Sequence, residues 1–393
     1  MTSSELGGAE RVVLDWLEFG DDRLSKIVII PKQGKIIAEL NRLNLPYEII
    51  ELNTIQKISR TKKTLLDFGK ASIHLIAYML KLFKITKKYR CQIIYSHGLK
   101  ADFFSGLLSF FFPIKVVWHL HVYCPRTGLF AAIYKRLSKR VSMAIANSRS
   151  VSEWSQKVIL TEMKTIYCGI RTDYYQQIDK GIARQTLNLS WTQDHFLIGM
   201  VSALAPWKGI DVFLSALPKV KNAFPKLTAI ICGEVIAETR GHEKYDQTLK
   251  ELAETLGLSS VVAFLPFQKN PSAVYSILDI FVHCSKEPEP FGRVVSEARL
   301  CGTPVIATKG GGVTEQIESG INGILVPMGC STSLAEALLD LMKKTTKRTQ
   351  IGQKGKHWVN NHLGIDRFVA QVDEVMKNLL GSPLQVNRTN RKT

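Results

Sequence analysis

The chain has 393 residues, of which 45% are hydrophobic and 22% charged, and its formal net charge is +18. That length exceeds what a single hydrophobic core usually serves, so we expect two globular domains. No stretch reaches the roughly 18–20 apolar residues of a membrane span, and the first ten residues lack a signal-peptide pattern. The seven cysteines are scattered without a CxxC pair, which disfavours a disulfide framework and indicates a reducing, cytoplasmic location.

Apolar β-branched runs alternate with helical patterns along the whole chain, which is typical of doubly wound α/β proteins. The pattern predicts strands at 26–30, 47–52, 92–96, 116–121, 143–146, 165–167, 196–201, 227–232, 261–265, 280–283, 304–307 and 324–326. Segment 173–194 lacks a clear period and is expected to be a linker. We therefore predict two Rossmann-like domains, at 1–185 and 186–365, followed by a helix at 366–380 and a frayed basic tail at 381–393.

Near the N-terminus, Gly7 and Gly8 precede an apolar run at 12–17. Such a turn and helix bind phosphate after the first strand of a doubly wound domain. The residues before Gly7 show no strand pattern, so we infer that this strand is missing. A translation start upstream of Met1 is favoured over a degraded copy, because a sheet without its middle strand leaves backbone groups unpaired.

Segment 57–90 carries ten basic residues and one acidic residue. Lys81, Lys84 and Lys88 interleave with apolar residues at helical spacing, as in helices that bind membrane surfaces. Two interpretations remain open: a solvated basic face beside a buried helix, or docking onto an anionic membrane that carries a lipid-linked acceptor. The apolar run at 103–112 is too short to cross a bilayer.

Histidines gather at the ends of two predicted strands in the first domain. Alternation along 116–121 places His119 and His121 on one face of the sheet, at the carboxyl end where such sheets bind ligands. His97 follows the strand at 92–96 and is a second candidate, and we take His97 and His119 as candidates on the acceptor side. A structural role remains the alternative for His97 and His121. A metal site is not expected, because the His119–His121 pair has no third ligand at a suitable spacing.

In the second half, the most informative stretch runs from Glu289 to Glu297. Glu289 lies in a loop between Pro288 and Pro290, and a helix is predicted to open soon afterwards. The start of a helix attracts anions, so two carboxylates beside it suit a ligand with hydroxyls at both ends and phosphates between. Lys208 follows the strand at 196–201. A glycine run follows the strand at 304–307 and precedes a predicted helix: Gly310, Gly311 and Gly312.

The segments 289–297, 301–307, 310–315 and 322–327, in this order, resemble the donor-binding block of family 4 glycosyltransferases. The resemblance implies the GT-B fold, in which two Rossmann-like domains face each other across a cleft and the last helix returns to the first domain. It also implies retaining, metal-independent transfer from a UDP- or GDP-sugar to a hydroxyl of a glycan or lipid-linked acceptor, in cell-surface polysaccharide or glycolipid synthesis. No resident cofactor is implied.

The same resemblance implies roles for individual residues. Glu289, His121 and Lys208 are the catalytic candidates: Glu289 holds the transferred sugar, His121 lies near it, and Lys208 clamps the diphosphate. Donor-binding contacts are implied for Glu297, on the ribose hydroxyls, and for the following residues: Phe291, Gly292, Arg293, Gly310, Gly311, Gly312, Gly7 and Gly8. Ala203 stands where the family usually has arginine, and Ser202 stands where it has glycine.

Two alternatives belong to other functional classes. A sugar-nucleotide-binding or scaffold protein without catalysis would fit Ala203 and the missing strand. A nucleic-acid-binding protein would fit the charge alone, but the aromatic residues do not alternate with the basic ones and no recognition motif is present. Nucleic acid is therefore not an expected partner.

Overall fold

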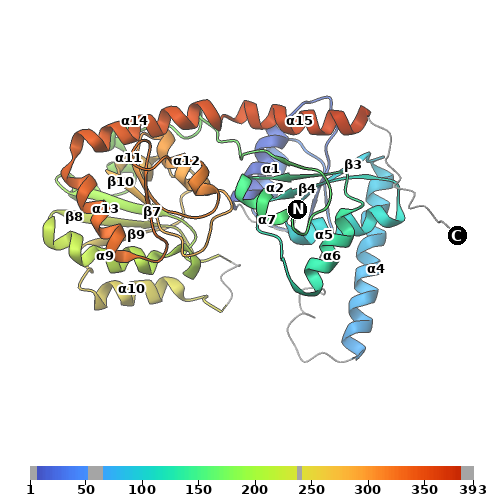
Figure 1. Cartoon of the computed structure of the whole chain (residues 1–393), viewed down its shortest axis with the longest axis horizontal. Helices are drawn as coiled ribbons and strands as arrows, with labels where there is room; N and C mark the ends of the chain where they lie inside the picture. The colour runs from blue at the N-terminus through green and yellow to red at the C-terminus, as the bar shows by residue number, and fades with distance from the viewer. Residues whose placement is uncertain (1–6, 52–64, 237–240, 382–393) are drawn as a thin grey trace. The chain divides into compact units, whose positions relative to one another are not determined.

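The structure is a computed structural model that describes residues 7–51, 65–236 and 241–381 (Figure 1). The chain divides into two compact units, the first made of Met1–Gly169 with Ile365–Thr393 and the second of Ile170–Gly364. Among the described residues, no helix combines the length and the apolar character that a membrane crossing requires.

The first unit is built on a parallel sheet of four strands in the order β3-β4-β5-β6. The strands are β3 (Ile93–His97), β4 (Lys115–Leu120), β5 (Met143–Ala146) and β6 (Met163–Thr165). The helices that connect them are α5 (Leu99–Phe111), α6 (Gly128–Ser138) and α7 (Arg149–Ser155). Crossover helices of this kind are what parallel pairing requires. Trp118 of β4 is fully buried, and a Cβ on Gly106 of α5 would lie 2.7 Å from its ring. The small residue therefore lets α5 pack closely on the sheet.

A second, smaller sheet in this unit pairs β1 (Val28–Ile30) with β2 (Tyr47–Ile49) in parallel, and α2 (Ile36–Arg42) connects them. Helix α4 (Leu65–Lys88) leads from this region to β3. Within the described ranges, no strand joins β1 to β3, so the two sheets are separate. The proposed absence of a first strand concerns residues 1–6, which lie outside the described residues.

Helix α15 (Ile365–Gly381) belongs to the first unit and packs against α1 (Gly8–Phe19). The carboxylate of Asp373 accepts hydrogen bonds from Trp16 Nε1 and from the backbone N–H of Asp21, both at 2.8 Å. Phe368 packs against Gly169, where a Cβ would lie 2.7 Å from the Cβ of Phe368. These contacts hold the last helix on the same unit as the first.

The second unit contains a six-stranded parallel sheet in the order β12-β11-β10-β7-β8-β9. Its strands are β7 (Phe196–Val201), β8 (Leu227–Cys232), β9 (Val262–Leu265), β10 (Ile280–His283), β11 (Val305–Thr308) and β12 (Ile324–Val326). Every residue of β8, β10 and β11 is buried, as expected for parallel strands covered on both faces. The strand order reverses between β7 and β10, which is where sheets of this type bind ligands.

Helices cover both faces of this sheet (Figure 1). One group packs together on one face: α9 (Ile210–Ala223), α10 (Tyr245–Thr255) and α13 (Ser331–Lys343). The other group comprises α8 (Lys180–Thr186), α11 (Ser272–Ile277), α12 (Arg293–Leu300) and α14 (Thr345–His362). The twelve predicted strands correspond to β1 through β12, with ends that differ by three residues at most.

The predicted linker at 173–194 is wrong, because this segment is an ordered part of the second unit. It contains α8 and the 3-10 helix η1 (Ser190–Thr192). Helix α8 packs against α11, and Lys180 Nζ lies 2.7 Å from Asp279 Oδ1. Only Ala183 of α8 is buried, so the helix has no apolar stripe for the sequence pattern to reveal. The break between the units follows Gly169 instead of residue 185.

Candidate functional site

The carboxyl ends of β7 and β10 meet through one close backbone contact. After β7 the chain passes Ser202 and Ala203 and forms the 3-10 helix η2 (Pro206–Lys208). Gly209 follows as the C-cap residue of this helix. Gly209 has φ +69°, and a Cβ there would lie 1.9 Å from the carbonyl oxygen of Cys284. Only glycine fits this left-handed conformation and this approach. The contact places Lys208 at the edge where the strand order reverses.

Lys208 and Glu289 form an ion pair at this edge. Lys208 Nζ donates to Glu289 Oε1, and the same oxygen accepts from Ser285 Oγ at 2.9 Å and lies 3.7 Å from His283 Nε2. Burial alone would raise the pKa of Glu289, but Lys208 and His283 together hold that pKa well below its ordinary value. Glu289 is therefore an ionised carboxylate that is only 14% exposed.

The glycine run lies beside Glu289. The backbone N–H of Gly312 donates to the carbonyl oxygen of Glu289 at 2.8 Å, so the loop after β11 is held against the loop after β10. Gly311 has φ +63°, a conformation that side chains other than glycine rarely adopt. The run leads into the four-residue 3-10 helix η3 (Gly312–Glu315), which is shorter than the predicted helix.

Helix α12 begins immediately after Gly292, which has φ +83°. One turn into this helix, Glu297 is 6% exposed and accepts a hydrogen bond from Tyr275 Oη at 2.9 Å. The pKa of Tyr275 lies well above its ordinary value, mainly because the phenol is buried and also because Glu297 beside it is negatively charged. The phenol therefore stays protonated and acts as a donor. Arg293 Nε lies 3.6 Å from Glu297 Oε1. Phe291, buried just before α12, accepts a backbone hydrogen bond from the side chain of Gln316.

The second unit thus brings together most of the predicted donor-site residues. Lys208, Glu289, the glycine run and the start of α12 all lie at the carboxyl ends of β7, β10 and β11. Sequence patterns did not predict the direct Lys208–Glu289 pair, nor the contributions of His283 and Ser285. His283 ends β10 and Ser285 follows two residues later, and their position at the end of a buried strand was the available signal. Chemically, the group offers a ligand two cationic side chains, two carboxylates and the partly buried backbone of the glycine run.

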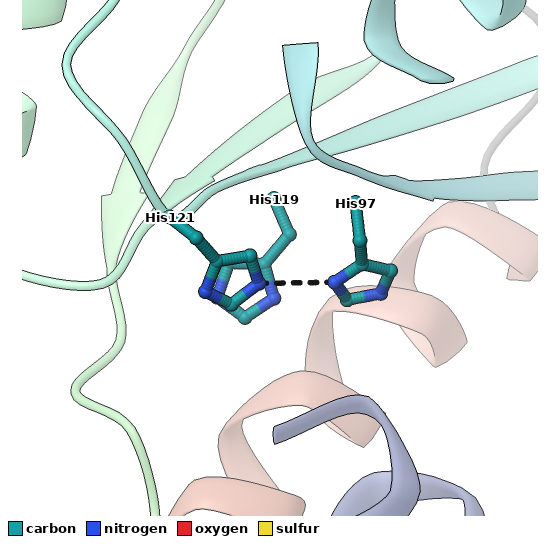
Figure 2. Close-up of side chains that lie close together, drawn as sticks. All are labelled: His97, His119 and His121. Carbon is teal, nitrogen blue, oxygen red and sulfur yellow. Dashed lines mark hydrogen bonds between the residues drawn. The ribbon is translucent and has the colours of Figure 1, made fainter. Parts of the chain in front are cut away.

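In the first unit, three histidine rings lie together (Figure 2). His97 ends β3, His119 is its register partner in β4, and His121 follows the end of β4 at Leu120. His97 Nδ1 and His121 Nε2 are 3.0 Å apart, and the rings of His119 and His121 are 4.1 Å apart between centroids. The prediction that His119 and His121 share one face is confirmed. Burial, and then the neighbouring histidines, lowers the pKa values of His97 and His119 well below the ordinary range.

The expectation that His119 and His121 have no third histidine near them is wrong. Spacing along the chain offered only the His119–His121 pair, whereas parallel pairing of β3 with β4 brings His97 into the same group. One ring nitrogen from each histidine lies within 4.8 Å of the other two. A partner on an adjacent strand cannot be identified from its distance in sequence.

Gly7 and Gly8 lie at the start of α1. Gly7 is the N-cap residue and α1 begins at Gly8. A Cβ on Gly7 would lie 2.7 Å from the carboxylate of Glu10, in the first turn. A carboxylate at this position stabilises the positive end of the helix dipole itself. Phosphate binding by Gly7 and Gly8 stays a prediction.

Comparison with known proteins follows the division into two units. Residues 6–174 match the model described as Glycosyltransferase Family 4, and residues 186–358 match the one described as Glycosyl transferases group 1. A D-inositol 3-phosphate glycosyltransferase of Stackebrandtia nassauensis is 29% identical over 189 residues, which are 47% of this chain and 41% of that protein. A GDP-mannose-dependent alpha-(1-6)-phosphatidylinositol monomannoside mannosyltransferase of Mycolicibacterium smegmatis is 28% identical over 174 residues, 42% of this chain and 43% of that protein. The matches span less than half the length of these relatives.

A solved structure matches over nearly the whole chain. Anabaena HepE in complex with UDP-glucose is 26% identical, with a TM-score of 0.80, and the match covers 96% of this chain and 98% of that one. Sucrose-phosphate synthase from Thermosynechococcus elongatus shares the fold, with 17% identity and a TM-score of 0.77. This match covers 98% of this chain and 96% of the synthase chain.

Proposed function

Since the chain belongs to the group 1 glycosyltransferases of family 4 and has the GT-B fold, we propose that it transfers a monosaccharide from a nucleoside diphosphate sugar to a hydroxyl group. The observation that carries the proposal is the site on the second unit, where Lys208, Glu289 and Glu297 surround the start of α12 and the glycine run. The UDP-glucose complex of HepE favours a UDP-sugar donor. A GDP-sugar is the second candidate, supported by the similarity to the mannosyltransferase.

In the proposed reaction, the bond between the anomeric carbon and the diphosphate breaks, and a bond to the acceptor oxygen forms on the same face of the sugar. The acceptor proton passes to an oxygen of the departing diphosphate, so no protein nucleophile is needed. Lys208 and the backbone N–H groups of Gly310 and Gly311 stabilise the leaving charge, while the N–H of Gly312 stays bonded to the carbonyl oxygen of Glu289. The transfer step as proposed is independent of any metal or resident cofactor. Lys208 and these groups act in a partly buried site, where such interactions are stronger than in water.

The carboxylates have separate roles in this proposal. Glu297 binds the ribose hydroxyls and is oriented by Tyr275, whose phenol donates to one of its oxygens. Glu289 binds the hydroxyls of the transferred sugar. The diphosphate draws Lys208 toward itself, while Ser285 and His283 keep Glu289 in place. On the first unit, His121 is the candidate for contact with the sugar and acceptor, with His97 and His119 beside it.

Helix α4 supports a membrane-bound acceptor. Ile73, Ile76 and Leu80 are 66%, 58% and 52% exposed and recur at helical spacing. Lys81 and Lys84 are exposed on the following turn, and Figure 1 shows the N-terminal half of α4 extending away from β3. A helix with exposed apolar and basic side chains binds anionic lipid surfaces. We propose that this surface docks the enzyme at the cytoplasmic face of a membrane carrying a lipid-linked acceptor, for cell-surface glycan or glycolipid synthesis.

The proposed activity is tested with a panel of UDP- and GDP-sugars. Binding is measured by calorimetry, and donor turnover is measured in the same preparations with and without hydroxyl acceptors. Binding with transfer or slow donor hydrolysis supports an enzyme. Tight binding without turnover would instead support a sugar-nucleotide-binding protein, the alternative that Ala203 favours.

Membrane docking is tested by flotation with vesicles of neutral lipid alone or with anionic lipid added. We expect the chain to float with anionic vesicles and an Ile76→Asp variant to lose this binding. An Ile182→Asp variant is the matched control, because Ile182 is 59% exposed but lies on the second unit. Equal flotation with neutral and anionic vesicles would contradict the docking proposal.

A further inference from the structure

We propose that His97, His119 and His121 bind one divalent transition-metal ion, with Zn²⁺ the best fit. The site lies in the first unit, whereas the residues proposed to handle the diphosphate all lie in the second. His121 is also the candidate contact for the sugar and acceptor, but binding of an ion requires neither of them, so the inference goes beyond the proposed function and its test does not depend on it. Three imidazoles with a fourth position for a small ligand form a common zinc coordination set.

The separation of the three ligand atoms suits a small ion. One ring nitrogen from each histidine lies within 4.8 Å of the others, and His97 Nδ1 is already 3.0 Å from His121 Nε2. Tetrahedral zinc, with zinc–nitrogen bonds of about 2.0–2.1 Å, requires ligand nitrogens about 3.4 Å apart. The His97–His121 pair is hydrogen-bonded in the structure, so an ion would replace that bond, and small rotations of the rings would set the zinc spacing. Figure 2 shows the three rings gathered side by side.

The sheet fixes the positions from which the rings project. His97 and His119 are register partners on neighbouring parallel strands. Side-chain alternation returns His121 to the face of His119. A site built on adjacent strands is held more rigidly than one built on loops. Three ligands on such a scaffold need little ordering when the ion binds.

Tyr95 orients the ring of His119 through a hydrogen bond. Tyr95 Oη and His119 Nδ1 are 2.6 Å apart, and Trp16 packs edge-on against Tyr95 at 5.1 Å between centroids. When Nδ1–H donates to the phenol oxygen, the lone pair of His119 lies on Nε2. Within the described part of the chain, His119 Nε2 is buried and makes no hydrogen bond. Metal-binding histidines are usually oriented by such a hydrogen bond from the other ring nitrogen.

Three imidazole ligands carry no charge of their own when they bind a metal. Among the described residues, the candidate group contains no carboxylate or thiolate. No protein ligand would therefore neutralise the positive charge of a bound ion. We expect an anion, such as hydroxide, in the fourth position.

The test uses the full chain after removal of metal with a chelator. Titration with Zn²⁺ in a calorimeter should give one site per chain. Co²⁺ should give the intense visible absorption of a tetrahedral site with nitrogen ligands. We expect His119→Ala to abolish both signals and Tyr95→Phe to weaken Zn²⁺ binding by about 10–100-fold. His357→Ala is the matched control, because His357 is an exposed histidine of α14 in the second unit and should leave both signals unchanged.

A second variant, His119→Phe, fills the buried position with a ring that cannot bind metal. Circular dichroism of each variant establishes that it is folded. A folded wild-type chain without a stoichiometric Zn²⁺ site would overturn the proposal, as would full binding by a folded His119→Phe variant. These readouts need no nucleotide-sugar, so failure of the metal site and failure of the transferase proposal are distinguishable.

Discussion

The Lys208–Glu289 ion pair offers the sharpest test of the second unit. The perturbation is Lys208→Met, which keeps the length of the side chain and removes its charge. Glu289 would then be a carboxylate, 14% exposed, that keeps its contacts with Ser285 and His283. Removing one partner of a fully buried pair costs about 3–5 kcal/mol. Because Lys208 is 24% exposed and two polar contacts remain, we expect a loss of about 2–3 kcal/mol at pH 7.

The pH dependence follows from the sign of the pKa shift. In the wild-type chain the pKa of Glu289 lies below its ordinary value of 4.5. Its contribution to stability is therefore complete above pH 4.5 and is lost as the pH falls toward the folded-state pKa. In Lys208→Met the lowering by Lys208 is lost while burial still raises the pKa, so the pKa of Glu289 should be higher than in wild type. The ionised carboxylate then contributes less stability, and the variant has less of it to lose as the pH falls. The difference in the free energy of unfolding between wild type and Lys208→Met should therefore be smaller at pH 4 than at pH 7.

The assay is denaturant unfolding of wild type, Lys208→Met, Glu289→Gln and the double variant at both pH values. Contacting charges should give a coupling energy of about 1–2 kcal/mol in the double-mutant cycle. Lys286→Met is the matched control: Lys286 is 36% exposed, lies 2.9 Å from Asp211, and should cost less than about 1 kcal/mol. Additive single effects, or a stability difference independent of pH, would refute the reasoning.

Three further predictions concern other parts of the chain. Glu297→Ala should mainly raise KM for the donor and Glu289→Ala should mainly lower kcat; negligible effects of both on steady-state turnover would contradict their roles. Gly209→Ala should destabilise the second unit by about 3 kcal/mol in thermal or denaturant unfolding, because a Cβ there would lie 1.9 Å from the Cys284 carbonyl oxygen. Gly257→Ala, with φ +66° but open space around it, should cost only about 1–2 kcal/mol, and equal costs would argue against the contact. Asp373→Ala should destabilise the first unit by about 1–3 kcal/mol in denaturant unfolding, because it leaves buried Trp16 Nε1 without its acceptor. The control is Glu374→Ala, at an exposed position, which should change stability by less than about 1 kcal/mol. A similar loss in both variants would refute the role of Asp373.

The strands and the donor-site residues of this protein could be predicted from local patterns. Buried parallel strands appear as continuous apolar β-branched runs, which is why β7, β8 and β10 coincide with their predicted ranges. Glu289, Glu297 and the glycine run lie within a short segment whose order along the chain is itself informative. The alternation of His119 with His121 also needs only the two-residue period of a strand.

Contacts between distant residues were decided by the tertiary structure alone. Helix α8 buries only Ala183, so it left no apolar period, and its packing against α11 makes the expected linker part of the second unit. The Lys208–Glu289 pair joins the ends of β7 and β10, which are adjacent in the sheet although two strands separate them in the chain. His97 joins His119 and His121 only because β3 pairs with β4. Strand order and register bring these side chains together, and neither is encoded in the local spacing of the residues.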